Sequence, residues 1–154
     1  MTHELEKDPL FLLYDAARLM RTRADQRARR MGMTRAQWVI LAWLELRPGL
    51  SQNELANLVE LEPISVARLI DRLEGHGLVE RRADPKDRRI RRLHLLPAAT
   101  PVLTEIHAYR AELSASLHTA FGGERLQQLT TSLLDLKSAF LEVTQSAAGD
   151  GAAS

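Results

Sequence analysis

Apolar residues recur at helical spacing along most of the chain. From Asp8 to Met31 they fall at intervals of three, four and seven residues, which places them on one stripe of a helix. Gly32 then supplies a residue suited to the C-terminal end of that helix. We therefore predict an N-terminal helix whose apolar stripe consists of Leu10, Leu13, Ala17, Met20, Ala24 and Met31.

Two capping boxes predict the starts of the next two helices. In a capping box, a Ser or Thr and a Glu or Gln three residues later satisfy each other's free backbone N–H groups. Thr34 with Gln37 fits this pattern. Ser51 with Glu54 fits it too and opens a short helix over residues 52–59. The residues predicted to face the core are Trp38, Leu41, Ala42, Leu44, Leu55, Ala56 and Leu58.

A fourth helix follows the third after only a few residues. Pro63 stands at its first position, where the missing N–H of proline costs nothing, and either Gly75 or Gly77 ends it. The residues predicted to face inward are Val66, Leu69, Ile70 and Leu73. Two short helices joined by a tight turn form a helix-turn-helix, whose second helix reads DNA.

The apolar period changes from helical to alternating after this helix. Residues 78–82 and 90–95 are predicted to be two short strands, with the polar, turn-rich segment 83–89 between them. A β-hairpin that directly follows the second helix of a helix-turn-helix is a wing.

Pro97 ends the second strand, and most of the remaining chain is predicted to be helical. Its first apolar stripe contains Leu103, Ile106, Tyr109 or Arg110, Leu113, Leu117 and Ala120. A second stripe steps by three and four residues, as a heptad seam does, which suits packing on a neighbouring helix. This stripe contains Leu126, Leu129, Leu133, Leu136 and Phe140. The small and polar residues 146–154 are predicted to be a disordered tail.

Length and composition exclude several classes of protein. The 154 residues carry a formal net charge of only +1, so the total charge does not indicate a nucleic-acid binder. There is no cysteine, which excludes a disulfide framework, a thiolate metal site and a cysteine-based redox sensor. The N-terminus lacks the order of a secretory signal, and no apolar run approaches the ~20 residues that span a bilayer. We therefore expect a soluble, cytoplasmic protein.

Positive charge is concentrated in the predicted wing. From residue 81 to residue 92 only Asp84 and Asp87 are acidic, whereas the basic residues are Arg81, Arg82, Lys86, Arg88, Arg89, Arg91 and Arg92. Such a hairpin repels itself without an anionic partner, and the narrow, negative minor groove of DNA accepts inserted arginines. A solvated charge run is the ordinary alternative, but the position directly after a helix-turn-helix favours DNA binding.

The outward face of the fourth helix carries the residues expected to read the major groove. Ser65 suits a hydrogen bond to a base or phosphate, and Arg68 suits a bidentate contact with guanine. Ile64 suits a thymine methyl group, and Arg72 also faces outward. For each of them the alternative is an idle, solvent-facing side chain, because phosphate contacts and plain surface look alike in sequence.

Three segments of the chain match a known family. They are residues 33–39, 70–79 and above all 84–95. The last of these segments contains the family's wing pattern, which is Asp, any residue, Arg, three residues, Leu, any residue, Leu. On these segments the chain resembles the MarR family of bacterial regulators over about residues 10–141. Within this family, the chain resembles the SlyA-like members.

The resemblance implies a mainly α fold with a small β-hairpin wing. A winged helix-turn-helix DNA-binding domain over residues 33–97 would be flanked by a helical dimerisation region made of residues 1–32 and 98–145. The implied function is that of a homodimeric transcription regulator, a repressor, on a pseudo-palindromic operator. One departure is Leu96-Pro97, because the family usually places a threonine directly after the last leucine of the strand.

The resemblance also implies roles in the wing, where Arg89 would enter the minor groove while Asp87 orients the wing by a salt bridge. Independently of the resemblance, the N-terminus of the third helix is expected to offer free N–H groups to a phosphate. The residues predicted to contact DNA are Ser51, Gln52, Ile64, Ser65, Arg68, Arg72, Arg82, Asp87, Arg88, Arg89 and Arg91.

The family often binds a small aromatic acid between its dimerisation helices and its DNA-binding lobe. By resemblance, Arg18, Trp38 and Arg68 would line that cleft, with arginine for the carboxylate and the indole for the ring. Trp38 also lies on the inward face of its helix, so core packing is the alternative. No metal or cofactor is predicted. The expected partners are double-stranded DNA, a second copy of the chain and a small aromatic acid.

Other classes of function fit the sequence less well. The histidines lie outside any Ser/His/Asp, HExxH or phosphate-loop pattern, which argues against an enzyme. His107 and His118 share a helix face, but they would meet around a metal only across a dimer. A ligand-independent or architectural DNA-binding protein stays open, because the sequence separates it poorly from a sensor. The arginine-rich wing argues against a module that binds only proteins.

Overall fold

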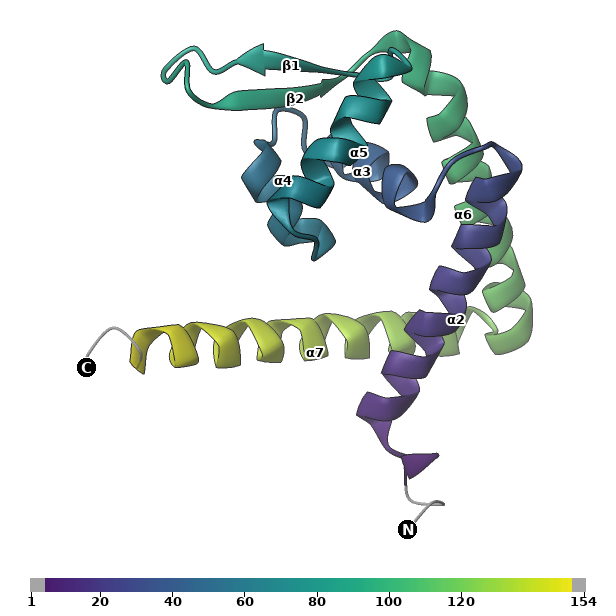
Figure 1. Cartoon of the computed structure of the whole chain (residues 1–154). Coiled ribbons are helices and arrows are strands. Elements are labelled where there is room, and N and C mark those ends of the chain that lie inside the picture. Colours follow the sequence, from purple (N-terminus) through teal and green to yellow (C-terminus); the bar gives the residue numbers. More distant parts are fainter. Residues whose placement is uncertain (1–4, 151–154) are drawn as a thin grey trace. The chain divides into compact units, whose positions relative to one another are not determined.

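The computed structural model describes residues 5–150, and of these the side chains of residues 5–143. It confirms the predicted fold class: a mainly helical chain with one two-stranded antiparallel hairpin (Figure 1). The elements are α2 (Pro9–Arg30), α3 (Arg35–Leu46), α4 (Gln52–Val59), α5 (Pro63–Gly75), β1 (Val79–Ala83), β2 (Arg91–Leu95), the 3-10 turn η1 (Pro97–Ala99), α6 (Thr100–Phe121) and α7 (Gly123–Asp150). The chain divides into two compact units, Met1–Tyr109 and Arg110–Ser154, so the boundary falls within α6.

Side-chain chemistry sets the starts of α3 and α4. The Thr34 hydroxyl accepts a hydrogen bond from the Gln37 N–H at 3.2 Å, and the Gln37 side-chain oxygen accepts one from the Thr34 N–H at 2.9 Å. Ser51 and Glu54 form the same reciprocal pair at 3.2 and 2.7 Å. Both predicted capping boxes are therefore confirmed.

Proline and glycine mark the ends of α5 and of the hairpin. Pro63 stands in the first turn of α5, as predicted. Gly77 has a φ of +69°, a left-handed conformation that glycine adopts without strain, whereas Gly75 is the last helical residue. At the departure from the family pattern, Pro97 opens η1, and the Leu96 N–H donates to the Leu78 carbonyl at 2.9 Å.

The core of the first unit lies mainly between α3, α4, α5 and the hairpin, and buried residues of α2, η1 and α6 complete it. Its largest fully buried side chains are Ile40, Leu41, Leu44, Leu55, Val66, Ile70, Leu73, Val79 and Leu93. Ile40 was not among the residues predicted to face the core, and Ala42 and Leu58 are only half-buried. Ile40 is buried because α3 contacts α2, α4, α5 and β2, so more than one face of this helix is covered.

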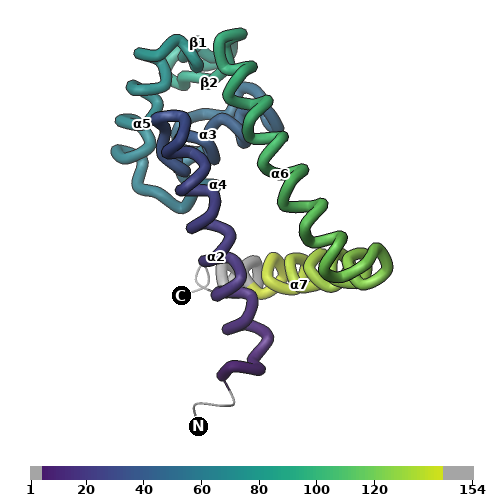
Figure 2. Tube along the Cα trace, turned by 90° about the vertical axis from the view of Figure 1, so that its right-hand side faces the viewer, coloured from purple at the N-terminus to yellow at the C-terminus, as the bar shows by residue number. Residues whose placement is uncertain are grey.

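The hairpin is attached to the segment that opens α4. β1 and β2 pair with Val79 opposite Leu95 and Arg81 opposite Leu93. The Leu93 N–H donates to the Leu50 carbonyl at 2.9 Å, and the Gly49 N–H donates to the Leu93 carbonyl at 3.0 Å. Figure 2 shows the hairpin clustered with α3, α4 and α5.

The second unit contains the end of α6 and the whole of α7. Several of its large apolar residues are exposed: Leu117, Phe121, Leu129, Leu133, Leu134, Phe140, Leu141 and Val143. Tyr109, the last residue of the first unit, packs against the core, whereas Arg110 is exposed. Of these two candidates for the apolar stripe of α6, Tyr109 is therefore the buried one. α7 continues to Asp150, past the predicted helix end at residue 145, because the alanines near its end are strong helix formers. The rest of the predicted tail, residues 151–154, lies outside the described residues.

No helix in the described part of the chain is long and apolar enough to cross a membrane.

Candidate nucleic-acid interface

The outward face of α5 carries all of the residues predicted on it. Val66, Ile70 and Leu73 are buried, which fixes the rotation of the helix and leaves the opposite face to solvent. The exposed residues of that face include Ile64, Ser65, Arg68 and Arg72. The side of α5 away from the core therefore presents hydroxyl, guanidinium and apolar groups together.

The basic residues of the wing divide into two groups. Arg81, Arg82 and Arg92 form ion pairs with carboxylates of the same unit. The remaining ones are exposed, and no ion pair involves them within the described residues: Lys86, Arg88, Arg89 and Arg91. We call these four the wing-tip cations. The charge that is available to an external partner is therefore concentrated at the tip.

Arg81 ties β1 to α5. Its Nη2 donates to Asp71 Oδ1 at 2.7 Å, and its backbone N–H donates to Glu74 Oε1 at 3.1 Å. Its Nη1 forms a further ion pair with Glu74. Arg82, which was predicted to contact DNA, pairs with its neighbour Glu80 through Nε at 2.6 Å. Arg81 therefore fixes the hairpin relative to the helix that carries the outward-facing serine and arginines.

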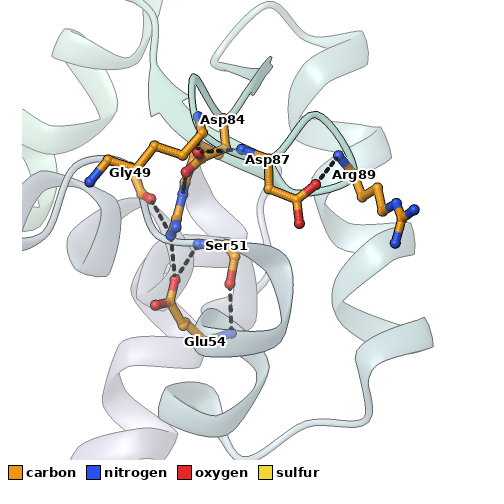
Figure 3. A network of polar contacts seen from close by, with 8 residues as sticks. Gly49, Ser51, Glu54, Asp84, Asp87 and Arg89 are labelled. Carbon is orange, nitrogen blue, oxygen red and sulfur yellow. Dashed lines mark hydrogen bonds and ion pairs between the residues drawn. The ribbon is translucent and has the colours of Figure 1, made fainter.

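Arg92 connects the hairpin to α4, and Figure 3 shows the two carboxylates that it binds, Asp84 and Glu54. Its Nε donates to Asp84 Oδ2 at 2.7 Å. Its Nη1 donates to Glu54 Oε2 at 2.9 Å and, over a longer distance of 3.3 Å, to the Gly49 carbonyl. We call Arg92, Asp84 and Glu54 the Arg92 cluster.

Both carboxyls of the Arg92 cluster are stabilised in the ionised form. The hydrogen bond from Arg92 is the largest cause that lowers the pKa of Asp84, and two backbone N–H groups of the wing turn add to it. The pKa of Glu54 is also lowered, first by the hydrogen bonds from Ser51 and then by the charge of Arg92. Both acids are therefore negative at neutral pH, where they neutralise part of the wing's positive charge.

The turn at the wing tip is held by aspartate side chains. Asp84 Oδ1 accepts hydrogen bonds from the Lys86 N–H at 2.7 Å and from the Asp87 N–H at 3.1 Å. Asp87 Oδ1 accepts one from the Arg89 N–H at 2.9 Å. Asp87 was expected to orient the wing by a salt bridge, but within the described residues its carboxylate forms no ion pair. It acts on the Arg89 backbone instead, because the tight turn brings that N–H within reach.

A cavity of about 410 Å³ lies between the start of α4 and the wing. Four residues predicted to contact DNA line it together: Ser51, Gln52, Arg89 and Arg91. The remaining lining residues are Asn53, Glu54, Arg81, Ile90 and Arg92, none of which was among the residues predicted to contact DNA. The first turn of α4 and four arginines line this cavity, and such a lining suits an anionic group such as a phosphate.

Within the described residues, no hydrogen bond, ion pair or ring contact joins the three residues predicted to bind a ligand, Arg18, Trp38 and Arg68. Arg18 is exposed on α2 and pairs with Asp15 at 2.7 Å. Trp38 is only 4% exposed and packs against Tyr109, with ring centroids 6.1 Å apart. The Trp38 indole N–H and the Tyr109 hydroxyl are buried, and neither forms a hydrogen bond within the described residues. Sequence reasoning missed Tyr109 as a neighbour of Trp38, because the contact joins α3 to α6.

The histidines that were considered for a metal have other surroundings. His107 Nε2 lies 2.8 Å from Glu45 Oε2 on α3. His118 lies beside Gly123 at the junction of α6 and α7. In the described part of the chain no three acidic or histidine residues are grouped so that they would hold a metal ion.

Known proteins are similar to this chain in sequence and fold. The sequence profile of the MarR family matches residues 33–90. The transcriptional regulator PA3341 is 31% identical, with 85% of this chain and 96% of that chain covered and a TM-score of 0.75. The transcriptional regulator SlyA is 22% identical, with 88% and 96% covered and a TM-score of 0.75. The complex of S. aureus MepR with DNA contains a chain that is 22% identical, with 88% and 98% covered and a TM-score of 0.71.

Proposed function

Because this chain belongs to the MarR family of transcription regulators, we propose that it is a sequence-specific, cytoplasmic repressor that binds double-stranded DNA as a homodimer. Its operator is a pseudo-palindrome with half-sites about one helical turn, ~10 bp, apart. The observation that carries this proposal is the group of wing-tip cations, which are exposed and form no ion pair within the described residues.

The wing tip and α5 make different kinds of contact in this proposal. Arg89 enters the minor groove and responds to its width. Ser65 and Arg68 read base edges in the major groove, where Ile64 contacts a thymine methyl group. A backbone phosphate sits at the cavity beside the N-terminus of α4, which places the helix on the duplex without reading sequence. The fold shared with MepR, which is known in complex with DNA, supports this arrangement.

Exposed apolar residues support the homodimer. On α2 they include Leu10, Phe11, Leu12, Leu13, Tyr14, Leu19 and Met20. Contiguous exposed apolar surface of this kind marks an interaction site in soluble proteins. The leucine stripe of α7 has the heptad-like spacing that packs on another helix. A second copy of the chain is the partner that covers both, and its two-fold symmetry matches that of a pseudo-palindromic operator.

DNA binding is tested by fluorescence anisotropy with the duplex that lies upstream of the protein's own gene. A scrambled duplex of equal length and composition is the control. We expect tighter binding to the upstream duplex and a steep loss of affinity with salt, because each neutralised phosphate releases counterions. Equal affinity for both duplexes contradicts sequence-specific regulation and supports an architectural protein. No binding to either contradicts the DNA-binding proposal.

A small aromatic acid is a second element of the proposal. The observation that favours it is the pair of buried polar groups, the Trp38 N–H and the Tyr109 hydroxyl, which lack hydrogen bonds within the described residues. Buried donors without partners are costly, and a ligand carboxylate or phenol near them supplies acceptors. Within the described residues, no hydrogen bond joins Arg18 or Arg68 to this pair, so the proposal rests on Trp38 and Tyr109.

Ligand response is tested by adding salicylate-like acids to the protein–DNA complex. We expect an acid to change DNA affinity in the wild type and to have less effect in Trp38→Phe, which keeps an aromatic ring, smaller than the indole, but removes the N–H donor. A complex that is indifferent to every acid supports a ligand-independent regulator instead. Equal responses of the wild type and Trp38→Phe remove Trp38 from the ligand site.

A further inference from the structure

We propose that Arg92 is a positioning residue, which holds the wing tip against the start of α4 so that Arg89 is presented to DNA. This inference rests on the proposed DNA binding. The charge pattern alone assigns Arg92 to the same basic cluster as Arg89, but the contacts of the two side chains differ. The Arg92 guanidinium binds the protein's own carboxylates, whereas the Arg89 side chain points away from them (Figure 3).

The guanidinium of Arg92 joins two separate elements. Asp84 directly follows β1, and Glu54 lies in the first turn of α4. The Arg92 side chain is 30% exposed and that of Asp84 is 13% exposed, so the pair is partly shielded from water. Because Nε and Nη1 are already engaged, the geometry of this cluster is set before DNA arrives.

A continuous series of hydrogen bonds leads from Arg92 to Arg89. Asp84 uses one carboxylate oxygen, Oδ2, for Arg92. Its other oxygen accepts the Lys86 and Asp87 N–H groups, which form the wing turn. The Asp87 carboxylate then accepts the Arg89 N–H. Loss of Arg92 therefore frees the aspartate on which the conformation of the turn depends.

The same cluster also orients the other wall of the cavity. Glu54 Oε2 accepts the Ser51 N–H at 2.7 Å and the Arg92 Nη1 at 2.9 Å, so one oxygen serves both the helix cap and the wing. Ser51 also forms a β-bridge with Arg92. The distance between the α4 N-terminus and Arg89, which line one cavity, is therefore fixed by Arg92.

A purely electrostatic role and a positioning role of the two carboxylates predict opposite changes in DNA affinity when the carboxylates are neutralised. Each negative charge near the interface repels DNA phosphates, so neutralising Glu54 and Asp84 strengthens binding if charge alone matters. If these carboxylates hold Arg92 and the wing turn, neutralising them weakens binding. The sign of the change separates the two explanations without any assumption about magnitude.

The test variant is Glu54→Gln/Asp84→Asn. Glutamine still fits a capping box, and the asparagine carbonyl still accepts hydrogen bonds from the wing turn, so the variant removes the ion pairs and little else. We expect its affinity for the upstream duplex to fall about five- to tenfold, the range that two partly exposed ion pairs support. Thermal unfolding and light scattering establish that the variant is folded and has the oligomeric state of the wild type.

The matched control is Glu60→Gln/Glu62→Gln. These two acids lie in the exposed turn between α4 and α5, and no ion pair involves them within the described residues. Their neutralisation changes the charge by the same amount, and we expect slightly tighter binding. If the Glu54→Gln/Asp84→Asn variant also binds more tightly, the positioning inference is wrong while the DNA-binding proposal stands. A wild type that binds no duplex overturns the DNA-binding proposal itself.

A double-mutant cycle with Arg89→Ala tests whether Arg92 acts through Arg89. Arg92→Met removes the ion pairs from the other side and keeps an unbranched side chain. If Arg92 positions Arg89, Arg92→Met weakens binding in the wild type but changes it less than about twofold in the Arg89→Ala background. Equal losses in the two backgrounds mean that Arg92 contacts DNA directly or acts on general stability, and they overturn the inference.

Discussion

The helices of the winged-helix core and the flanking helices α2 and α7 carry similar numbers of large apolar residues, but they bury them differently. On α3, Ile40, Leu41 and Leu44 are at most 1% exposed. On α2, Leu10 and Met20 are each 55% exposed, and several leucines of α7 are also exposed. The core is formed mainly by α3, α4, α5 and the hairpin, and α2 contributes only Ala28 to it. The flanking helices present apolar surface that another chain would cover.

The first prediction concerns the core and has the largest expected effect on stability. Leu73→Ala removes a fully buried side chain of α5 and leaves a cavity, which costs about 2–5 kcal/mol of unfolding free energy. The measurement is urea unfolding followed by circular dichroism. Leu46→Ala is the control, because this side chain is 70% exposed and its loss should cost little. Equal losses in both variants contradict the contrast between core and surface.

The second prediction concerns the flanking helices. Leu133 is 42% exposed on the leucine stripe of α7. If a second chain covers it, Leu133→Asp buries a charge at the interface and costs at least about 2 kcal/mol per copy. We expect light scattering to show a smaller particle than the wild type, and specific DNA binding to be lost with it. Leu46→Asp, outside these helices, should leave the oligomeric state unchanged. A Leu133→Asp protein that keeps the wild-type size removes this residue from the interface.

Local features of the sequence predicted most of the fold. The two capping boxes depend on residues three apart, so Thr34 and Ser51 identified the starts of α3 and α4 correctly. The alternation of residues 90–95 identified β2 because Leu93 faces the core. The burial of Ile40 and the half-exposure of Ala42 were missed, since they depend on how many neighbours surround α3.

The division of the wing's basic residues was beyond sequence reasoning. Arg92 meets Glu54, which is 38 positions away in the chain, and Arg81 meets Asp71, which is ten away. Only the folded chain brings these charges together. The pattern therefore identified a basic wing but not which of its residues stay available, and it offered no signal that Tyr109 contacts Trp38.

The third prediction concerns the surface of the winged-helix unit rather than its core. Arg89→Ala should weaken DNA binding about tenfold, roughly 1–2 kcal/mol, because it removes a charged contact in the groove. Dimerisation and thermal stability should stay unchanged, since Arg89 is exposed and forms no ion pair within the described residues. Anisotropy titrations at several salt concentrations measure the affinity and the salt slope together. Wild-type affinity in this variant contradicts the role of the wing.

The fourth prediction, with the smallest effect, concerns pH. The pKa values of Glu54 and Asp84 are lowered in the folded protein, so their contribution to stability is complete above the ordinary carboxyl range. It is lost as the pH falls through that range towards the lowered values. The difference in Tm between the wild type and Glu54→Gln/Asp84→Asn should be constant from about pH 6 to 8 and should shrink below about pH 4. A difference that grows on acidification contradicts the assigned direction of the pKa shifts.

The central claim is that two chains, joined through their flanking helices, bind one duplex with their winged-helix units. The most direct test is sedimentation velocity of the protein with a labelled duplex from upstream of its gene, which measures how many chains bind and how salt changes the binding. We predict two chains per duplex and a complex that dissociates steeply with added salt. One chain per duplex, or a complex that is insensitive to salt, would contradict the account.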